Sequence, residues 1–503
     1  MRAVFIHPVI PETYWSFKYI LKFIHKKAAH VPLGLLTVAA MMPKDWQLRV
    51  VDMNVENLTD ETIRWADMVF IGAMVIQKQS VREVVQRCHA LGKKVVAGGP
   101  LFTNTPDDFP EIDHLVLNEA EITLPPFLED LAAGRPQRIY SSRERPDIKT
   151  TPLPRWDLIN FKHYASLSVQ YSRGCPFDCE FCDIVNLNGR QPRVKSNEQM
   201  LREFQILYDM GWRGRVFIVD DNFIGNRVKV KSFLRELIPW QETRKFPFSL
   251  YTEASVNLAQ DDELMDLMTS AGFDSVFLGL ETPAEESLVE CGKHQNRSID
   301  LVEAVKRIQR SGMEVMGGFI IGFDSDPPNI FERQIKFIQN SGVVKAMIGL
   351  LNAIPGTRLY QRLEKEGRLL KECTGDNCDG SLNFIPKMDP EILREGYQRV
   401  LNCIYSPREY YLRVLEFLRT YRPKRRRRIQ WLDVRALLNS IWYMGIRDKW
   451  RNKVYYWKLL IKALLFYRDA FGEAVSHAIF GYHFRKLLAG DGHHSQEQSK
   501  SGR

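Results

Sequence analysis

The sequence predicts an α/β protein in three parts: an N-terminal doubly wound parallel sheet, a central partial (β/α)6 TIM-like barrel, and a C-terminal, mainly α-helical domain. Three observations lead to this fold class. Short apolar strands alternate with helical stretches up to about residue 140. Six further strand-and-helix units follow a proline-containing linker. Beyond about residue 365, helical stretches rich in aromatic and basic residues replace the strands.

Composition and cysteine usage are those of a folded protein in a reducing compartment. The 503 residues are 45% hydrophobic and 11% aromatic, which suits two or three domains. Eight cysteines, three clustered and five scattered, do not form a disulfide framework. The N-terminus opens as a strand rather than a signal peptide, and no uncharged apolar run approaches the ~18–20 residues that span a bilayer. These features predict a cytoplasmic protein.

Residues 1–140 are predicted to form a Rossmann-like domain. Such a domain binds its ligand outside the carboxyl ends of its parallel strands. Glycines and polar residues stand at those ends, although ordinary turn chemistry also explains them. The predicted strands are Ala3–Ile6, Leu48–Val51, Met68–Ile71, Lys94–Ala97 and His114–Leu117.

A linker, residues 141–167, separates this domain from the barrel. Pro146, Pro152 and Pro154 interrupt it, and Trp156 is expected to dock it. The barrel is predicted over residues 168–365, with active-site groups at the carboxyl ends of its strands. These strands are expected at Leu167–Tyr171, Arg215–Val219, Phe248–Tyr251, Ser275–Leu280, Glu314–Ile321 and Lys345–Leu351.

A C-x3-C-x2-C array directly follows the first barrel strand. Cys175, Cys179 and Cys182 can bind three irons of a [4Fe–4S] cluster and leave the fourth iron open. Gly174 and Pro176 allow the loop to wrap closely around a cluster. The alternatives are a zinc site or three unrelated thiols, but no second cysteine pair or nearby histidine supplies a fourth zinc ligand.

This array resembles the signature of the radical S-adenosylmethionine (SAM) enzymes. The resemblance implies that Cys175, Cys179 and Cys182 bind the cluster and that SAM chelates the open iron. It also implies SAM contacts at the strand ends. Asp220, Asp221 and Asn222 stand where many members have Gly-Gly-Glu. For each acidic residue, the alternative is a charge at a helix N-terminus. The expected SAM-binding residues are Phe181, Asp220, Asp221, Asn222, Glu253, Glu281, Gly318 and Ile320.

With the cluster loop downstream, the first domain resembles the cobalamin-binding domain of B12-dependent radical SAM enzymes. Many cobalamin domains carry D-x-H-x-x-G, whose histidine binds cobalt, but here the stretch is Asp52-Met53-Asn54-Val55-Glu56-Asn57. Asn54 is a poor cobalt ligand beside imidazole, so we expect no protein histidine on cobalt. The expected cobalamin-binding residues are Leu33, Gly72, Met74, Gly98, Gly99, Asn118 and Glu119.

The C-terminal part is predicted to be a mainly helical domain over residues 366–489, followed by a polar, disordered tail over residues 490–503. Cys373 and Cys378 are interpreted as free thiols. Between Arg419 and Lys453 twelve Lys or Arg stand against two Asp, so this segment accounts for the whole net charge of +9 and the rest of the chain is close to neutral. The segment includes the run Lys424–Arg428, and four tryptophans, Trp431, Trp442, Trp450 and Trp457, lie in or near it. We expect this region to contact an anionic membrane surface, at the inner face of the membrane. The alternatives are that the aromatic residues form a core and that the basic run faces solvent or RNA.

Over nearly the whole chain, including Tyr14–Lys18 and Phe319–Asp326, the sequence resembles the hopanoid C-2 methylase group and its relatives. The resemblance implies methylation of an unactivated carbon of a lipid such as a hopanoid, with a [4Fe–4S] cluster, SAM and cobalamin as cofactors. Two SAM molecules are used in each turnover, one to generate a radical and one to methylate cobalt. A reductase, flavodoxin or ferredoxin supplies electrons. No residue is assigned as a catalytic acid or base.

Two alternatives stay open from the sequence. The same cofactors can carry out a radical rearrangement or ring closure without methyl transfer. A cobalamin sensor or an RNA-modifying protein is the alternative from a different class. The cluster loop argues against a sensor, and the absence of a recognisable RNA-binding β-barrel appendage argues against nucleic acid.

Overall fold

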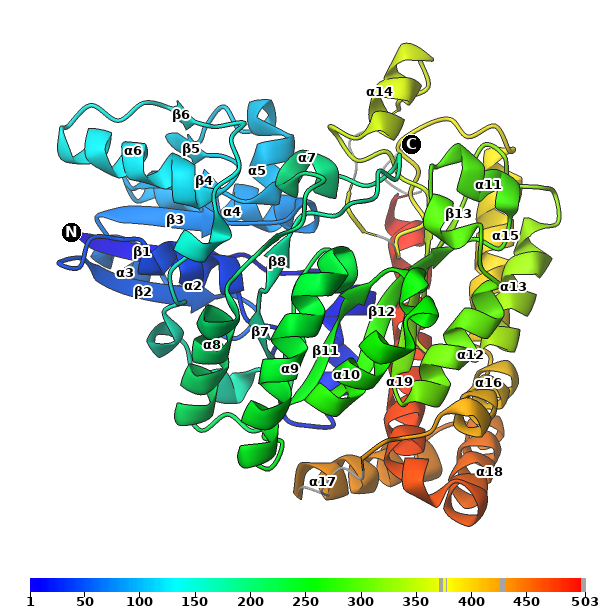
Figure 1. Ribbon diagram of the computed structural model, residues 1–503. Coiled ribbons are helices and arrows are strands. Elements are labelled where there is room, and N and C mark those ends of the chain that lie inside the picture. Colours follow the sequence, from blue (N-terminus) through cyan, green and yellow to red (C-terminus); the bar gives the residue numbers. More distant parts are fainter. Residues whose placement is uncertain (371–373, 377, 426–430, 499–503) are drawn as a thin grey trace.

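The computed structural model describes residues 1–370, 374–376, 378–425 and 431–498, with side chains described up to residue 489. Figure 1 shows the three predicted parts: the N-terminal sheet with its helices, the central barrel, and helices that cover the right side and the lower end of the view. The fold class predicted from the sequence is confirmed. Cys373 and Arg426–Arg428 lie outside the described residues.

The N-terminal sheet has six parallel strands in the order β2-β1-β3-β4-β5-β6. All five predicted strands are present, and β6 is an edge strand of two residues that the sequence analysis missed. Since every strand is parallel, the carboxyl ends lie along one edge. The strands are β1 (Arg2–His7), β2 (Gln47–Asp52), β3 (Met68–Gly72), β4 (Lys94–Gly98), β5 (His114–Val116) and β6 (Ile139–Tyr140).

Helices cover both faces of this sheet, as a doubly wound fold requires. Phe5 and Phe70 point to the face covered by α2 and α6, whereas Ile6 and Val69 point to the face covered by α4. Alternate side chains of each strand are therefore buried in two separate cores. The covering helices are α2 (Leu33–Ala40), α3 (Asp60–Trp65), α4 (Lys78–Ala90), α5 (Pro100–Asn104) and α6 (Ala120–Ala132).

The barrel is an open, six-stranded parallel sheet in the order β14-β13-β12-β11-β10-β7. All six predicted strands are present: β7 (Ser166–Val169), β10 (Arg215–Ile218), β11 (Ser249–Ala254), β12 (Phe273–Glu281), β13 (Glu314–Ile321) and β14 (Ala346–Leu350). Their outer faces are covered by α8 (Asn197–Asp209), α9 (Arg227–Thr243), α10 (Asp262–Ala271), α12 (Leu301–Ser311) and α13 (Ile330–Ser341).

The two faces of the barrel sheet differ in accessibility. Outward side chains such as Ile218, Leu250 and Leu278 are fully buried under the helices. The alternating inward residues on β10, β11 and β12, Phe217, Tyr251 and Phe277 among them, are only partly buried. The inner face therefore borders accessible space, which we call the lumen.

The segment between β1 and α2 leaves the N-terminal sheet and contacts the barrel. His30 packs against Phe217 at a ring-centroid distance of 5.4 Å, and Trp15 packs against Phe277 at 5.0 Å. These contacts place part of residues 1–140 against the inner face of the barrel, which local sequence patterns did not indicate. The segment includes α1 (Lys18–Leu21), which contacts α19.

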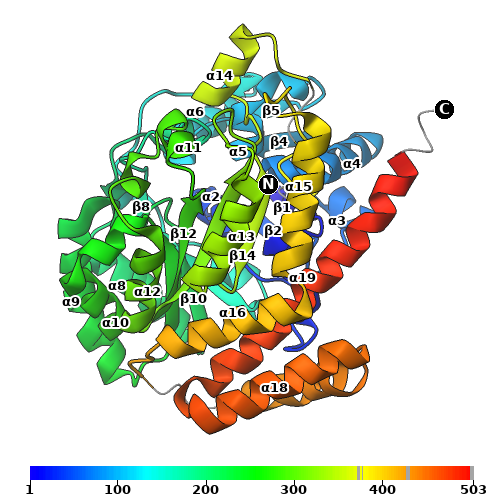
Figure 2. The same ribbon diagram turned by 90° about the vertical axis from the view of Figure 1, so that its right-hand side faces the viewer.

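The C-terminal helices pack along β14 and beneath the barrel (Figure 2). They are α14 (Arg358–Lys365), α15 (Pro390–Ile404), α16 (Pro407–Thr420), α17 (Trp431–Ser440), the π-helix η10 (Ile441–Ile446), α18 (Trp450–Phe466) and α19 (Phe471–Gln498). Helix α19 continues past residue 490, where we predicted a disordered tail to begin. Extending an established helix needs no new nucleation, so a polar sequence can continue one. Among the described residues, no helix combines the length and apolar character needed to cross a bilayer.

Candidate cluster, SAM and cobalamin sites

The three clustered cysteines lie on a loop between β8 (Ser172–Arg173) and α7 (Ile184–Asn188). Gly174 opens this loop with a φ of 99°, and a Cβ there would lie 2.9 Å from the carbonyl oxygens of Gly189 and Gln191. Only glycine fits such a backbone position without strain. The glycine thus allows the loop to turn back on the chain that follows it.

Two side-chain amides point toward the thiols. Asn222 Nδ2 lies 3.9 Å from Cys175 Sγ, and Gln295 Nε2 lies 3.8 Å from Cys179 Sγ. Burial raises the pKa of the Cys182 thiol, so that thiol stays protonated unless a cation compensates the thiolate. Hydrogen-bond donors directed at sulfur suit the thiolates of an iron–sulfur cluster, because the reduction potential of the cluster depends on such hydrogen bonds. The residues present therefore fit a [4Fe–4S] cluster.

A single metal ion would need its ligands to converge. Among the described residues, no three His, Cys, Asp or Glu side chains form a group that could hold one ion. Cluster ligands need no such convergence, because each thiolate binds a different iron.

A segment that the sequence analysis missed supplies further groups beside the loop. Lys293 pairs with Glu281, and the charges of Glu281, Cys179 and Cys182 raise its pKa against the effect of burial. The Cys291 carbonyl accepts a hydrogen bond from Glu180 N at 2.8 Å. In the sequence, a lone lysine in a polar turn carries no signal of this role.

The structure places Asp220 and Asp221 beneath the cluster loop. The Asp220 carboxylate accepts from Tyr171 N at 2.7 Å and from Ser172 Oγ at 2.6 Å. Asp221 accepts from Gly174 N at 2.8 Å and from Asn188 Nδ2 at 2.9 Å. Both carboxylates are hydrogen-bonded to the cluster loop or to residues beside it. Asp220 and Asp221 therefore position the loop.

Glu253 is the acidic residue with an uncommitted carboxylate. Its carboxylate makes no hydrogen bond or ion pair with a described residue, and burial together with the charges of Asp221 and Asp220 raises its pKa to about 8. A cation bound beside this carboxylate would lower its pKa again by stabilising the ionised form. Glu253 projects from the inner face of β11, at the carboxyl end of that strand.

The other expected SAM residues surround the same loop. Asn222 reaches Cys175, and Phe181 packs against Phe323 at 6.2 Å with Ile320 in the same cluster. A Cβ on Gly318 would lie 2.9 Å from Phe277 Cζ, so this glycine allows the ring to lie across β13. The strand ends thus bring the predicted residues together, as a barrel with parallel strands should.

The expected cobalamin residues lie along the carboxyl edge of the N-terminal sheet. The glycines there are required by the protein itself: a Cβ on Gly98 would lie 2.7 Å from the Val116 carbonyl oxygen, and Gly99 has a φ of 98°. Leu33, Met74 and Asn118 keep accessible side chains at this edge. The edge therefore presents apolar and amide groups, which fit a bulky corrin ring at the usual ligand position of this fold.

Glu119 has a different role from the one predicted. Its carboxylate is buried and lies 2.8 Å from both Arg173 Nη1 and Arg193 Nη2. Arg173 directly precedes Gly174 and also lies 2.9 Å from Glu121. Glu119 therefore connects the N-terminal sheet to the cluster loop and is not free to contact a ligand.

Asn54 occupies the position of the absent cobalt-binding histidine, and both ends of its amide are used. Its Oδ1 accepts from Ile10 N at 2.8 Å, and its Nδ2 donates to Asp52 at 2.8 Å. Asp52 also accepts from Tyr164 of the linker at 2.9 Å. Asn54 stabilises this loop, and no atom of its amide is left for a metal.

Comparisons with known proteins agree with this geometry. Residues 24–128 match the B12 binding domain, residues 169–338 the Radical SAM superfamily, and residues 357–494 a domain of unknown function (DUF4070). The fold of this chain is similar to that of TsrM from Kitasatospora setae, a radical SAM methyltransferase solved with cobalamin and a [4Fe–4S] cluster bound, with a TM-score of 0.62. That match has 14% identity and covers 97% of this chain and 99% of that chain.

Two curated proteins match over nearly the whole length. A Synechocystis protein named as an uncharacterized methyltransferase, sll1242, is 41% identical over 99% of this chain and 92% of its own. A Rhodopseudomonas palustris hopanoid C-2 methylase is 32% identical over 92% of this chain and 89% of its own. These matches support a [4Fe–4S] cluster, SAM and cobalamin as cofactors. The chain belongs to the cobalamin-dependent radical SAM methyltransferases.

Proposed function

We propose that the protein methylates an unactivated carbon of a polycyclic lipid such as a hopanoid. The observation that carries this proposal is the character of the barrel lumen. Phe217 and Tyr251 stack at 4.7 Å with nearly parallel rings, and Phe277 extends the same surface. A partly exposed aromatic surface of this kind favours a large apolar substrate.

The N-terminal segment that packs on part of this surface is also aromatic. Trp15 faces Phe277, and Trp15 also contacts Phe17, which packs against Phe480 of α19 at 5.7 Å. These side chains exclude water from a hydrocarbon and hold it beside the strand ends that carry Glu253 and Glu281. The similarity to a hopanoid C-2 methylase gives independent support for a lipid of this class.

At the site itself, Cys175, Cys179 and Cys182 would hold the cluster, and Glu253 would accept the ammonium group of SAM. Lys293 carries a positive charge toward the thiolates and suits the carboxylate of the same molecule. Leu33, Met74 and Asn118 would border cobalamin. When bound, the three cofactors supply a substrate radical and a methyl group, and the protein supplies position and a dry lumen.

A reduced flavodoxin or ferredoxin is the proposed electron donor. The proposal is tested by incubating the loaded enzyme anaerobically with reduced flavodoxin, SAM carrying a trideuterated methyl group, and a bacterial hopanoid fraction. Mass spectrometry should find the labelled methyl group in one lipid. A product of unchanged carbon count would instead support rearrangement or ring closure.

Phe277→Trp tests the lumen. The larger ring should reduce lipid methylation by about tenfold, because small displacements of a substrate carbon disrupt hydrogen transfer. SAM cleavage should persist in this variant. Tyr208→Trp on the outer helix α8 is the matched control and should keep both activities. Equal activity of the two variants would contradict a lumen-bound lipid.

A further inference from the structure

The surface formed by α17, η10 and α18, residues 431–466, is the most apolar exposed region of the described chain. More than half of the exposed large hydrophobic side chains in the described residues lie in this surface. Trp450 is 78% exposed and Trp431 is 71% exposed. Trp442 and Trp457 are exposed as well, so these four tryptophans are not the core of a helical subdomain. Large exposed apolar patches mark interaction sites.

The apolar residues of α18 form one stripe. Trp450, Trp457, Ile461 and Leu464 are spaced by seven, four and three residues, which places them on one face of an α-helix. The buried residues of the same helix, Tyr456, Leu459, Leu460 and Ala463, face the other way, toward α16 and α19. The helix thus has two apolar faces, and the described residues cover only one of them.

Basic side chains accompany this stripe. Arg451, Lys458 and Lys462 each directly follow a stripe residue, and all three are exposed. None of them makes an ion pair with any described residue. The stripe therefore has a positive flank along its whole length.

The surface is fixed in place rather than loosely attached. Tyr456 and Ser440 share a hydrogen bond of 2.8 Å, and Trp457 Nε1 donates to the Gly445 carbonyl at 3.2 Å. A Cβ on Gly445 would lie 3.0 Å from the Trp457 ring, so η10 and α18 pack closely. The tryptophans are held on the outside by these contacts.

We propose that residues 431–466 dock the enzyme on an anionic lipid bilayer. Tryptophan and tyrosine favour the interface, and a helix with an apolar stripe beside lysines and arginines lies flat in it. The basic flank complements anionic headgroups. This inference deepens the proposed function, because a membrane lipid does not reach the enzyme through water. It also assigns a role to part of the matched domain of unknown function.

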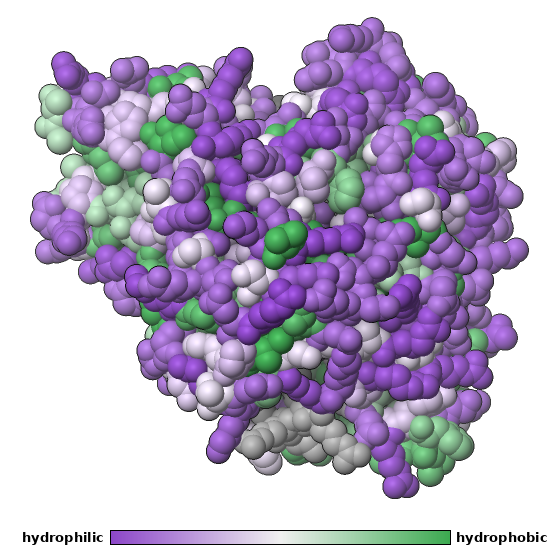
Figure 3. All heavy atoms as spheres, viewed as in Figure 1, coloured by the Kyte–Doolittle hydropathy of each residue, from purple (hydrophilic) through white to green (hydrophobic). Residues whose placement is uncertain are grey.

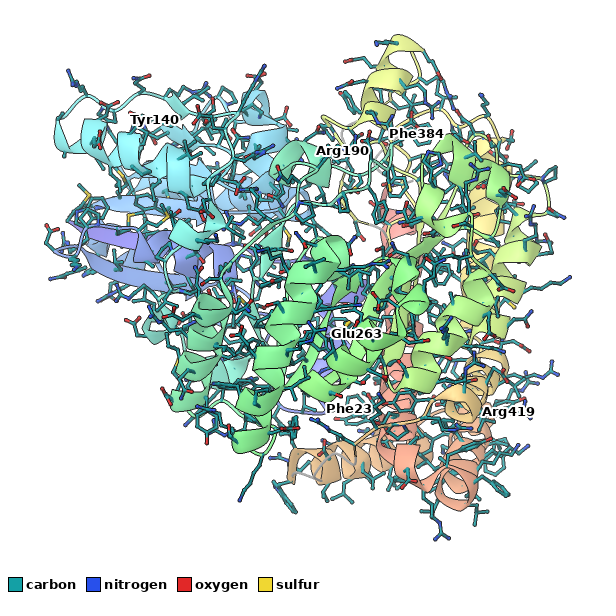
Figure 4. The ribbon with its side chains drawn as sticks, viewed as in Figure 1. Phe23, Tyr140, Arg190, Glu263, Phe384 and Arg419 are labelled. Atoms are coloured by element: carbon teal, nitrogen blue, oxygen red, sulfur yellow. The ribbon has the colours of Figure 1, made fainter. Side chains whose placement is uncertain are left out.

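The surface lies at the lower end of the molecule, away from the cluster loop. In Figure 4, Arg190, whose guanidinium lies 3.8 Å from Asp178 of that loop, is far above Phe23, which contacts Tyr443 of η10 at 5.4 Å. Figure 3 shows hydrophobic atoms at the lower right edge of the molecule, beside purple hydrophilic ones. Docking there leaves the cluster loop accessible to an electron donor.

Within the basic run Lys424–Arg428, which the sequence predicts to contact a membrane, the structure describes Lys424 and Arg425. Lys424 forms an ion pair with Asp266 of α10, and Arg425 donates to the Ser270 carbonyl at 2.6 Å while lying over Phe246. These two residues bind the barrel. Among the described residues, the basic side chains beside the stripe are Arg451, Lys458 and Lys462 of α18.

Vesicle flotation tests the proposal on the full chain without any turnover, so its failure is distinguishable from failure of the methylase proposal. Wild type should bind vesicles of phosphatidylcholine with phosphatidylglycerol and not phosphatidylcholine alone, and binding should weaken as salt rises. The triple variant Trp450→Glu, Ile461→Glu, Leu464→Glu should lose binding. The control Val228→Glu, Ile392→Glu, Leu412→Glu, at exposed sites elsewhere, should keep it.

A second variant tests the charges and leaves every apolar residue in place. Arg451→Gln, Lys458→Gln, Lys462→Gln should weaken partitioning by more than about tenfold, since each basic residue near an anionic surface contributes about 1 kcal/mol. Lys44→Gln, Lys94→Gln, Lys336→Gln is the control. Equal vesicle binding by variants and controls, or a dimer that both variant sets disrupt without any vesicle binding, would overturn the proposal.

Discussion

The Arg173 guanidinium lies 2.8 Å from the Glu119 carboxylate, and this buried contact joins the two cofactor domains. Glu119 follows the last core strand of the N-terminal sheet, and Arg173 is two residues before Cys175. The carboxyl edge of one sheet is thereby fixed against the loop at the edge of the other. The Glu119–Arg173 ion pair, which lies outside both ligand sites, would thus keep cobalamin and the cluster at a fixed position relative to each other.

Arg173→Ala should lower the free energy of unfolding by roughly 3 kcal/mol, because Glu119 and Glu121 lose a buried partner. Urea unfolding followed by circular dichroism measures this. Arg202→Ala removes an exposed pair with Glu198 and should cost about 0.5 kcal/mol or less. A similar small effect for both variants would show that the interdomain contact is not important for stability.

Replacing any one of Cys175, Cys179 and Cys182 by Ala should abolish reductive SAM cleavage. The cluster would lose one of its three protein ligands, while the cores of the protein remain. Iron content and 5′-deoxyadenosine formation under anaerobic conditions are the readouts. Cys403→Ala, on α15, should leave both unchanged. A triple variant that retains iron–sulfur absorbance and forms 5′-deoxyadenosine would contradict the cluster assignment.

Glu253→Gln should stabilise the SAM-free protein in a pH-dependent way. Burial and the charges of Asp221 and Asp220 raise the folded-state pKa of Glu253 to about 8 from its usual value near 4.5, so ionising Glu253 costs stability as pH rises through this interval. Since a difference of one pKa unit corresponds to about 1.4 kcal/mol, the amide should raise stability at about pH 8 by roughly 4 kcal/mol and near pH 5 by less than about 1 kcal/mol. Thermal unfolding across pH measures the difference.

The same variant should weaken SAM binding by about tenfold or more, since a charge-assisted hydrogen bond to the ammonium group is lost. Glu198→Gln, at an exposed position, is the control and should change neither property. A Glu253→Gln protein that is equally stable to wild type at both pH values and binds SAM normally would remove Glu253 from the site.

Cobalamin in this protein should have no histidine on cobalt. Asn54 stands at the histidine position and its amide is hydrogen-bonded at both ends within the protein. The EPR spectrum of the Co(II) form should be unchanged when the protein is labelled with nitrogen-15 histidine. Asn54→His is the informative comparison, since it restores the residue that other cobalamin domains use. A label-dependent hyperfine pattern in wild type would contradict this prediction.

The sequence was informative wherever a local pattern determines the structure. Short apolar runs indicate the strands, and the spacing of the three cysteines indicates a cluster-binding loop. The barrel and the cluster ligands could therefore both be predicted. Long-range contacts could not. Nothing in the stretch around Trp15 indicates that it crosses to the barrel, and Lys293 acquires its role only when its turn packs against the loop.

The acidic residues show the same limit at the site. Asp220 and Asp221 follow a barrel strand and Glu253 lies near the end of the next one, but only the first two carboxylates are hydrogen-bonded to the cluster loop and its neighbours. The C-terminal tryptophans could equally have formed a core. Their exposure follows from which face of α18 the neighbouring helices cover, and sequence periodicity does not decide that.

The balance of SAM-derived products tests the central claim most directly. Radical methylation through cobalamin uses one SAM to generate the radical and a second to supply the methyl group. In a single anaerobic reaction with the lipid substrate, 5′-deoxyadenosine, S-adenosylhomocysteine and methylated lipid should accumulate in equal amounts, and formation of the last two should require cobalamin. Formation of 5′-deoxyadenosine and altered lipid without S-adenosylhomocysteine would contradict the account.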